Sequence, residues 1–190
     1  MEISWRALIT QIHGMVFGAF FLLAIFAVLV ELWGAVYQAE PRVLTATGRW
    51  LERFYLICTV LIGWAAVLTG AYMVYPWYRA IPPAGVASLA QFPQALLKSS
   101  STTAGWHSLG MEWKEHVAWF APIAMTMVTY VSIRYGSSIR KLPQLRNALL
   151  VFLIVAFFAA GVAGYFGAEI DDHAPVHGGG TAIHWMGGNH

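Results

Sequence analysis

The sequence predicts an all-α protein, an integral membrane four-helix bundle with both termini outside. Apolar residues make up 58% of the 190 residues, and charged residues make up only 11%. An average soluble domain has roughly 25% charged residues. Four apolar stretches are long enough to cross a hydrocarbon core of about 30 Å as helices, and they cover residues 7–36, 54–75, 116–133 and 149–168.

The distribution of lysine and arginine predicts the orientation. The connections between the first and second stretches and between the third and fourth hold Arg42, Arg49, Arg53, Arg134, Arg140, Lys141 and Arg146. The opposite side holds only Arg6, Arg79, Lys98 and Lys114. Because short cytoplasmic loops carry the excess of positive charge, we expect both termini and the loop 76–115 to face outward. The expected location is the cell inner (cytoplasmic) membrane, crossed several times.

The chain divides into a transmembrane domain, residues 1–170, and a tail rich in histidine and glycine, residues 171–190. The first apolar stretch is longer than the core of a secretory signal, so we expect it to be retained as the first helix. Within the outer loop, apolar residues recur at helical spacing between Val86 and Leu97, which is typical of a helix lying on the membrane surface. The single cysteine, Cys58, excludes an internal disulfide and a C-x-x-C-H site for covalent haem.

Histidine is confined to one side of the predicted topology. All seven histidines fall in the outer half of a predicted helix or outside the membrane, and they are His13, His107, His116, His173, His177, His184 and His190. A polar side chain inside a membrane span is costly, and its usual explanation is a functional site with a partner. We therefore expect the function of these histidines to lie on the outer side.

Two of the histidines are expected at similar depth in different helices. His13 lies about two turns into the first helix, and His116 begins the apolar part of the third. Gly14 and Gly18 follow His13 in a G-x-x-x-G spacing, which lets a second helix or a flat ligand approach the backbone. Trp119, together with Phe17 and Phe120, would line the same region.

Two neutral imidazoles from different helices at one level are the usual ligands of a non-covalent b-type haem in a helix bundle. The placement of His13 and His116 resembles that of the small four-helix membrane b-type cytochromes. This resemblance implies one haem b, with both histidines as iron ligands. The second histidine pair that would hold a haem on the cytoplasmic side is absent from the sequence, so electron transfer across the membrane through two stacked haems is disfavoured.

The stretch GMEWKEHVAW, residues 110–119, supplies the other candidates. Glu112 and His116 are four residues apart on a helix, so the carboxylate can orient the imidazole nitrogen that faces away from a metal. Lys114 points elsewhere and can reach the interface or a haem propionate. His107 is the substitute ligand if His116 proves too exposed.

Two other interpretations remain open. Charged residues and tryptophans also mark the ordinary interface end of a membrane helix, in which case the chain is a cofactor-free structural or assembly subunit. Imidazole and carboxylate groups in the tail, among them His173 and His177, suit copper or zinc. Under this third interpretation the chain is an outward-facing copper- or zinc-binding membrane protein.

The expected function is electron transfer between an outward-facing redox protein and a quinone or a neighbouring membrane subunit. We find no nucleophile paired with a base and no phosphate-binding loop in the sequence. We therefore expect a non-catalytic subunit of an oxidoreductase complex, with other membrane subunits and the lipid membrane as partners. The basic pI near 8.8 reflects cytoplasmic loops that face anionic lipid, not nucleic-acid binding.

Overall fold

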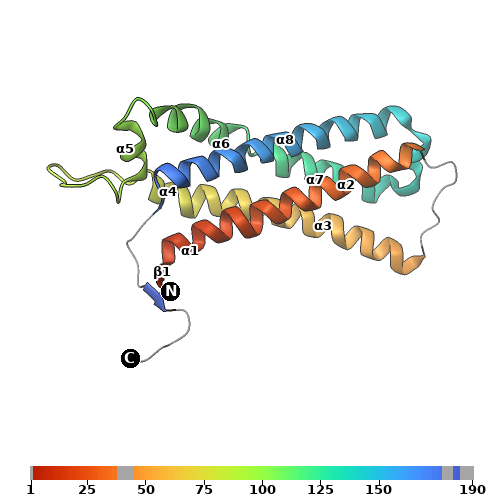
Figure 1. Cartoon of the computed structure of the whole chain (residues 1–190). Coiled ribbons are helices and arrows are strands. Elements are labelled where there is room, and N and C mark those ends of the chain that lie inside the picture. The colour runs from red at the N-terminus through yellow and green to blue at the C-terminus, as the bar shows by residue number, and fades with distance from the viewer. Residues whose placement is uncertain (1, 38–44, 177–181, 185–190) are drawn as a thin grey trace.

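The computed structural model describes residues 2–37, 45–176 and 182–184. It confirms the predicted class, because four long apolar helices pack together along their lengths (Figure 1). Within the described residues, the helices long and apolar enough to span a membrane are span 1 (Trp5–Gly34), span 2 (Ala46–Tyr78), span 3 (Trp106–Tyr135) and span 4 (Pro143–His173).

Three of these spans are made of several segments. Span 1 joins α1 (Trp5–Gln11), a π-helical segment (Ile12–Gly18) and α2, which continues to Tyr37 (Ala19–Tyr37). Span 2 joins α3 (Ala46–Thr69), a π-helical segment (Gly70–Val74) and α4 (Tyr75–Tyr78). Span 3 joins a π-helical segment (Trp106–Met111), α6 (Glu112–His116) and α7 (Phe120–Tyr135). Span 4 is the single helix α8 (Pro143–His173).

Local sequence explains where the helices begin. The Ser4 side chain accepts a hydrogen bond from the Ala7 amide at 3.2 Å, and Thr45 accepts one from the Gly48 amide at 3.1 Å. Both residues cap the orphan donors of a first helical turn. Pro143 opens α8 in the same way that Pro93 opens the short α5 (Pro93–Lys98), since a proline at the first position loses no helical hydrogen bond.

Two element boundaries differ from those expected. Helical structure in span 3 begins at Trp106, well before His116, and His116 is the last residue of α6. The surface helix expected between Val86 and Leu97 is confined to α5, because Pro93 fixes the first helical turn there. Smaller elements complete the fold, namely a 3₁₀ turn (Gly136–Lys141) and an antiparallel pairing of β1 (Glu2–Ser4) with β2 (Ala182–His184).

The helices are arranged in sequence order around the bundle. α2 packs against α3 and α8, and α7 also packs against α3 and α8. Spans 1 and 3 are therefore diagonal neighbours. β1 and β2 lie at the end of the bundle where span 1 begins and span 4 ends (Figure 1), and we call this the terminal end.

The main core lies in the other half of the bundle. Its buried members include Ile25 of span 1, Leu56 of span 2, Val128 of span 3 and Leu153 of span 4. A second, smaller cluster of buried residues closes the terminal end, and it consists of Tyr78, Leu97, Met111, Ile170 and Ala174. Between the two clusters, spans 1, 2 and 3 have no fully buried residue over residues 5–20, 64–77 and 112–120 respectively. The side chains of spans 1, 2 and 3 in this intermediate layer therefore stay partly exposed.

The terminal half also holds all the π-helical segments of the described chain. One lies in each of spans 1, 2 and 3, whereas α8 runs as a regular helix beside them. Wide π turns in membrane and soluble helices often mark functional sites, because they displace side chains from the regular α-helical positions. Span 3 is further interrupted at residues 117–119, where Pro122 has no N–H to donate to the carbonyl of Ala118.

Candidate functional site

His13 is held between span 1 and span 2. Its Nδ1 lies 3.2 Å from Oγ1 of Thr69, and the Thr69 hydroxyl donates its own hydrogen to the carbonyl of Ala65 at 2.6 Å. Because Thr69 has one hydroxyl hydrogen, Nδ1 of His13 must donate the bond between them. The backbone of Ala66 also hydrogen-bonds the His13 ring. With Nδ1 as the donor to Thr69, the neutral ring carries its lone pair on Nε2.

Gly70 makes this position possible. A Cβ atom built on Gly70 would lie 2.6 Å from Cε1 of His13, closer than any real contact. The Cε1 side of the imidazole therefore lies against bare backbone at the start of the π-helical segment of span 2. Any larger residue at Gly70 has to displace the ring.

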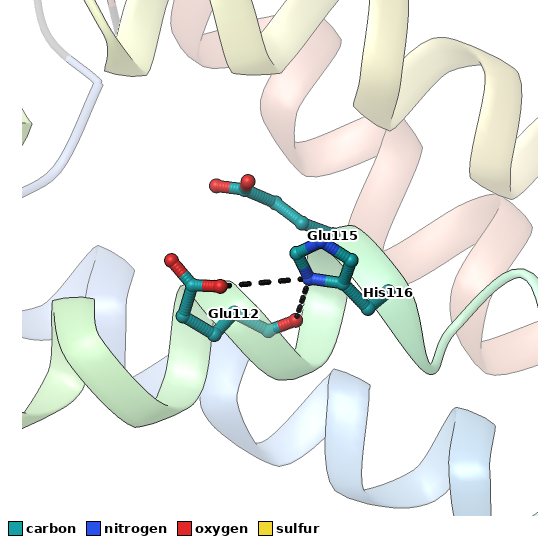
Figure 2. A group of neighbouring side chains, drawn as sticks. All are labelled: Glu112, Glu115 and His116. Atoms are coloured by element: carbon teal, nitrogen blue, oxygen red, sulfur yellow. Dashed lines mark hydrogen bonds and ion pairs between the residues drawn. The ribbon is translucent and has the colours of Figure 1, made fainter.

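His116 shows the same nitrogen usage in span 3. Its Nδ1 lies 3.0 Å from the backbone carbonyl of Glu112 and 3.5 Å from the Glu112 carboxylate (Figure 2). Both acceptors require Nδ1 to be the protonated nitrogen of the neutral ring. Nε2 is again left as the lone-pair nitrogen. The expected i, i+4 relationship between Glu112 and His116 is thus present, although the carbonyl is the closer partner.

Glu115 joins this pair to form an open group of potential ligands. One ligand atom from each of Glu112, Glu115 and His116 lies within 4.8 Å of the others. The side chains are open to the surroundings, with His116 69% exposed and Glu112 57% exposed. Such a group can bind a cation, but exposed carboxylates often gather without one.

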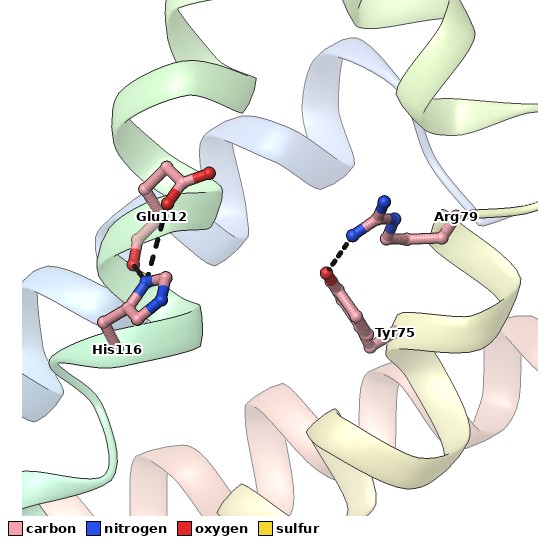
Figure 3. Close-up of polar contacts among 4 residues, drawn as sticks. All are labelled: Tyr75, Arg79, Glu112 and His116. Atoms are coloured by element: carbon pink, nitrogen blue, oxygen red, sulfur yellow. Dashed lines mark hydrogen bonds and ion pairs between the residues drawn. The ribbon is translucent and has the colours of Figure 1, made fainter.

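A second polar pair faces this group from span 2. The Arg79 guanidinium donates a hydrogen bond to the Tyr75 hydroxyl at 2.7 Å and lies over the ring, 5.5 Å from its centroid. Figure 3 shows the Tyr75–Arg79 pair and the Glu112–His116 pair on opposite sides of the space between spans 2 and 3. The bond to Tyr75 raises the pKa of the Arg79 guanidinium above its ordinary value, so this side carries a fixed positive charge.

Lys114 points toward span 4. Its ammonium donates to the carbonyl of Ala163 at 3.2 Å, and a Cβ built on Gly167 would lie only 2.8 Å from Nζ. No acidic residue of the described chain forms an ion pair with Lys114. Its charge is close enough to act electrostatically on the His13 ring. Lys114 therefore brings a positive charge into the same half of the bundle as the two imidazoles.

The remaining candidate histidines are already engaged or lie elsewhere. His107 has partners on both ring nitrogens, with Nδ1 2.7 Å from the Tyr78 hydroxyl and Nε2 3.4 Å from Nε2 of Gln94. Ligation by His107 would need one of these bonds to break. His173 bonds the carbonyl of Glu169 at 2.8 Å and packs on Trp106. His177, the other alternative ligand, lies outside the described residues.

The expected lining residues are partly in place. Trp119 packs edge-on against Trp64 of span 2, with 6.4 Å between the ring centroids. A Cβ on Gly14 would meet no atom within 4 Å, and one on Gly18 would meet only the backbone oxygen of His13 at 3.5 Å. The close helix approach expected at these two glycines is therefore not seen. The tight glycine contacts occur instead at Gly63, Gly70, Gly110 and Gly167.

Sequence reasoning missed four contributors to the site. Thr69 and Gly70 looked like ordinary interior residues of an apolar helix. Their only signal was their position, near the end of span 2 that the predicted topology puts at the depth of His13. Tyr75 and Arg79 carried a clearer signal, because an i, i+4 tyrosine–arginine pair at the end of a span is a plausible side-chain contact. Such a pair also occurs as an ordinary interface anchor, which made it inconspicuous.

The structure brings His13 and His116 into the same half of the bundle on diagonal spans, and no hydrogen bond or ring contact joins them within the described chain. Both rings leave Nε2 as the available nitrogen, which is the nitrogen that usually binds iron, zinc or copper when Nδ1–H has a protein acceptor. The fold is that of a multi-pass, four-helix membrane protein. No protein-family model matches the chain, and no curated protein and no solved structure matches it either.

Proposed function

We propose that this protein is a haem b-binding membrane subunit that transfers electrons between an outward-facing redox protein and a quinone or a neighbouring subunit. The single observation that carries the proposal is that two imidazoles have the same tautomer, with the hydrogen on Nδ1. His13 and His116 each direct Nδ1–H to an acceptor of the chain and keep Nε2 as the lone-pair nitrogen. An acceptor on Nδ1–H fixes the ring orientation and raises the basicity of the ligating nitrogen.

The surroundings support the same proposal. Both histidines lie in the layer between the two buried clusters, on diagonal spans of the bundle. Facing helices of a bundle are the usual supports of an axial histidine pair. Lys114 contributes a positive charge at this level, which suits the negative propionates of a haem.

The proposed orientation puts this half of the bundle on the outer side of the inner (cytoplasmic) membrane. Seven of the eleven lysines and arginines lie in the two connections at the opposite end or in the helix ends beside them, and positive charge is retained on the cytoplasmic side. Electrons would then enter from an outward-facing partner and leave to a quinone or to another membrane subunit. The protein would act as one component of a larger oxidoreductase complex.

A metal site without haem is the second candidate, and one observation favours it. Glu112, Glu115 and His116 bring their ligand atoms within 4.8 Å of one another, and imidazole with carboxylate suits zinc or copper. This site would use His116 but not His13. The two candidates therefore differ in their dependence on His13.

The test is a reduced-minus-oxidised absorption spectrum and a pyridine haemochrome assay of the purified full chain. The variants are His13→Ala, His116→Ala and, as a matched control, His173→Ala, whose ring also bonds a carbonyl four residues earlier. We expect a b-type spectrum in wild type and in the control, and loss of that spectrum in the other two variants. Folded wild-type protein without haem would overturn the proposal. Zinc or copper that is lost in His116→Ala but retained in His13→Ala would establish the second candidate.

A further inference from the structure

A cavity of about 270 Å³ lies beside the candidate site and shares Arg79 with it, between the end of span 2 and α5. Its lining consists of Arg79, Ala80, Ile81 and Pro82 on one side and Gln94, Ala95 and Lys98 on the other. The chain leaves span 2 at Tyr78 and returns to the same place at α5. The cavity is therefore formed by two segments that are held together by the small buried cluster around Tyr78 and Leu97.

The charge of this lining is one-sided. Two of its seven residues are cations, Arg79 and Lys98, and none is acidic. The single hydrogen bond that Arg79 makes, to Tyr75, leaves most of its five N–H donors unused. Glu115 acts on Arg79 electrostatically but does not line the cavity. Gln94 adds an amide that can donate a further hydrogen bond.

A lining with two cations and no acid suits an anionic ligand, and the position of the cavity indicates which kind of anion it would bind. Arg79 follows the last residue of span 2, so it lies at the level of the lipid headgroups. Ile81 is 88% exposed beside it, which suits a side chain immersed in lipid. A guanidinium and an ammonium that line one cavity at headgroup depth match the phosphate group of a lipid, because a planar guanidinium can bind two phosphate oxygens at once.

We propose that the cavity between residues 79–82 and α5 binds a phosphate group, with Arg79 and Lys98 as its cationic partners. Because the cavity lies at the level of the lipid headgroups, the phosphate group is expected to come from a phospholipid and not from free phosphate. This site does not use the histidines, and it does not depend on the presence of haem. Its role would be to anchor the outer loop to the membrane through a bound lipid.

The test is calorimetric titration of the full chain in an uncharged detergent. The titrants are short-chain phosphatidylglycerol, diacylglycerol of the same chain length, which has no phosphate, and inorganic phosphate. The double variant Arg79→Gln/Lys98→Gln removes both cations. The matched double variant Arg134→Gln/Lys141→Gln removes one arginine and one lysine from the opposite end of the bundle. A further variant, Ala95→Phe, fills the cavity while both cations remain, and thermal unfolding checks that each variant folds.

We expect phosphatidylglycerol to bind wild type and the opposite-end variant equally, and to bind Arg79→Gln/Lys98→Gln and Ala95→Phe at least tenfold more weakly. Diacylglycerol should not bind. Inorganic phosphate that binds as tightly as the lipid, with the same losses, would retain the phosphate site and overturn the lipid as its source. Equal losses in both double variants, unchanged binding in Ala95→Phe, or no binding of either phosphate compound to wild type would overturn the proposal.

Discussion

The His13 imidazole lies against the backbone of Gly70, so close that a Cβ on Gly70 would stand 2.6 Å from its Cε1 atom. This contact joins spans 1 and 2 at the level where both are π-helical. The imidazole fits between the two spans only because residue 70 has no side chain. The orientation of a candidate ligand in one helix is therefore determined by the absence of a methyl group in another.

Gly70→Ala should consequently displace the His13 ring. We expect a loss of about 1–3 kcal/mol in the free energy of unfolding, the usual cost of overpacking a fitted contact. Under the proposed function, haem content falls as well. Gly34→Ala is the matched control, because a Cβ there meets no atom within 4 Å. Thermal unfolding in detergent measures the stability effect, and equal stability of the two variants would contradict the contact.

Thr69→Val should release the His13 ring from its fixed tautomer. Valine has nearly the shape of threonine but offers no acceptor to Nδ1–H, so a partly buried donor loses its partner at a cost of about 1–3 kcal/mol. Thr69→Ser keeps the hydroxyl and is expected to behave as wild type. The measurement is the unfolding midpoint together with haem content. A loss in Thr69→Ser with none in Thr69→Val would mean that the methyl group, and not the hydrogen bond, matters.

Lys114 and Gly167 should be energetically coupled. Alanine at position 167 would put a Cβ 2.8 Å from the ammonium nitrogen of Lys114 and disturb its bond to the Ala163 carbonyl. In a Lys114→Met background the same alanine should meet a more adaptable apolar group. We expect a coupling energy of about 0.5–3 kcal/mol in a double-mutant cycle, measured by unfolding. Strictly additive effects would show that Lys114 does not reach Gly167.

The predicted orientation can be tested with introduced cysteines. In a Cys58→Ser background, we expect Ser100→Cys in intact cells to react with a membrane-impermeant maleimide, because it lies in the connection between spans 2 and 3. Ser138→Cys, in the connection between spans 3 and 4, should react only after the membrane is opened. Both serines are exposed in the structure, so accessibility to the reagent differs only through the membrane. The reverse labelling pattern would show that the topology is opposite to the predicted one.

The sequence alone was sufficient for the class, the number of spans and the confinement of candidate groups to one end. Composition and the length of an apolar stretch determine whether a helix can cross the hydrocarbon core of a membrane. The structure has a long apolar helix at each of the four expected stretches. Boundaries were less well predicted. Span 3 begins at Trp106 because helix formation continues through the polar residues before His116, whereas hydropathy detects only the apolar part.

Tertiary structure decided how the candidate residues are held. No pattern along the chain shows that Thr69 binds Nδ1 of His13, that Gly70 admits its ring, or that Lys114 turns toward Ala163 instead of the interface. These relationships depend on the rotation and spacing of neighbouring helices, which follow from packing across the bundle and from the π-helical turns. Sequence determines which groups a membrane helix carries and at what depth, because depth depends on local hydropathy. The partner of each group is set only when the helices pack.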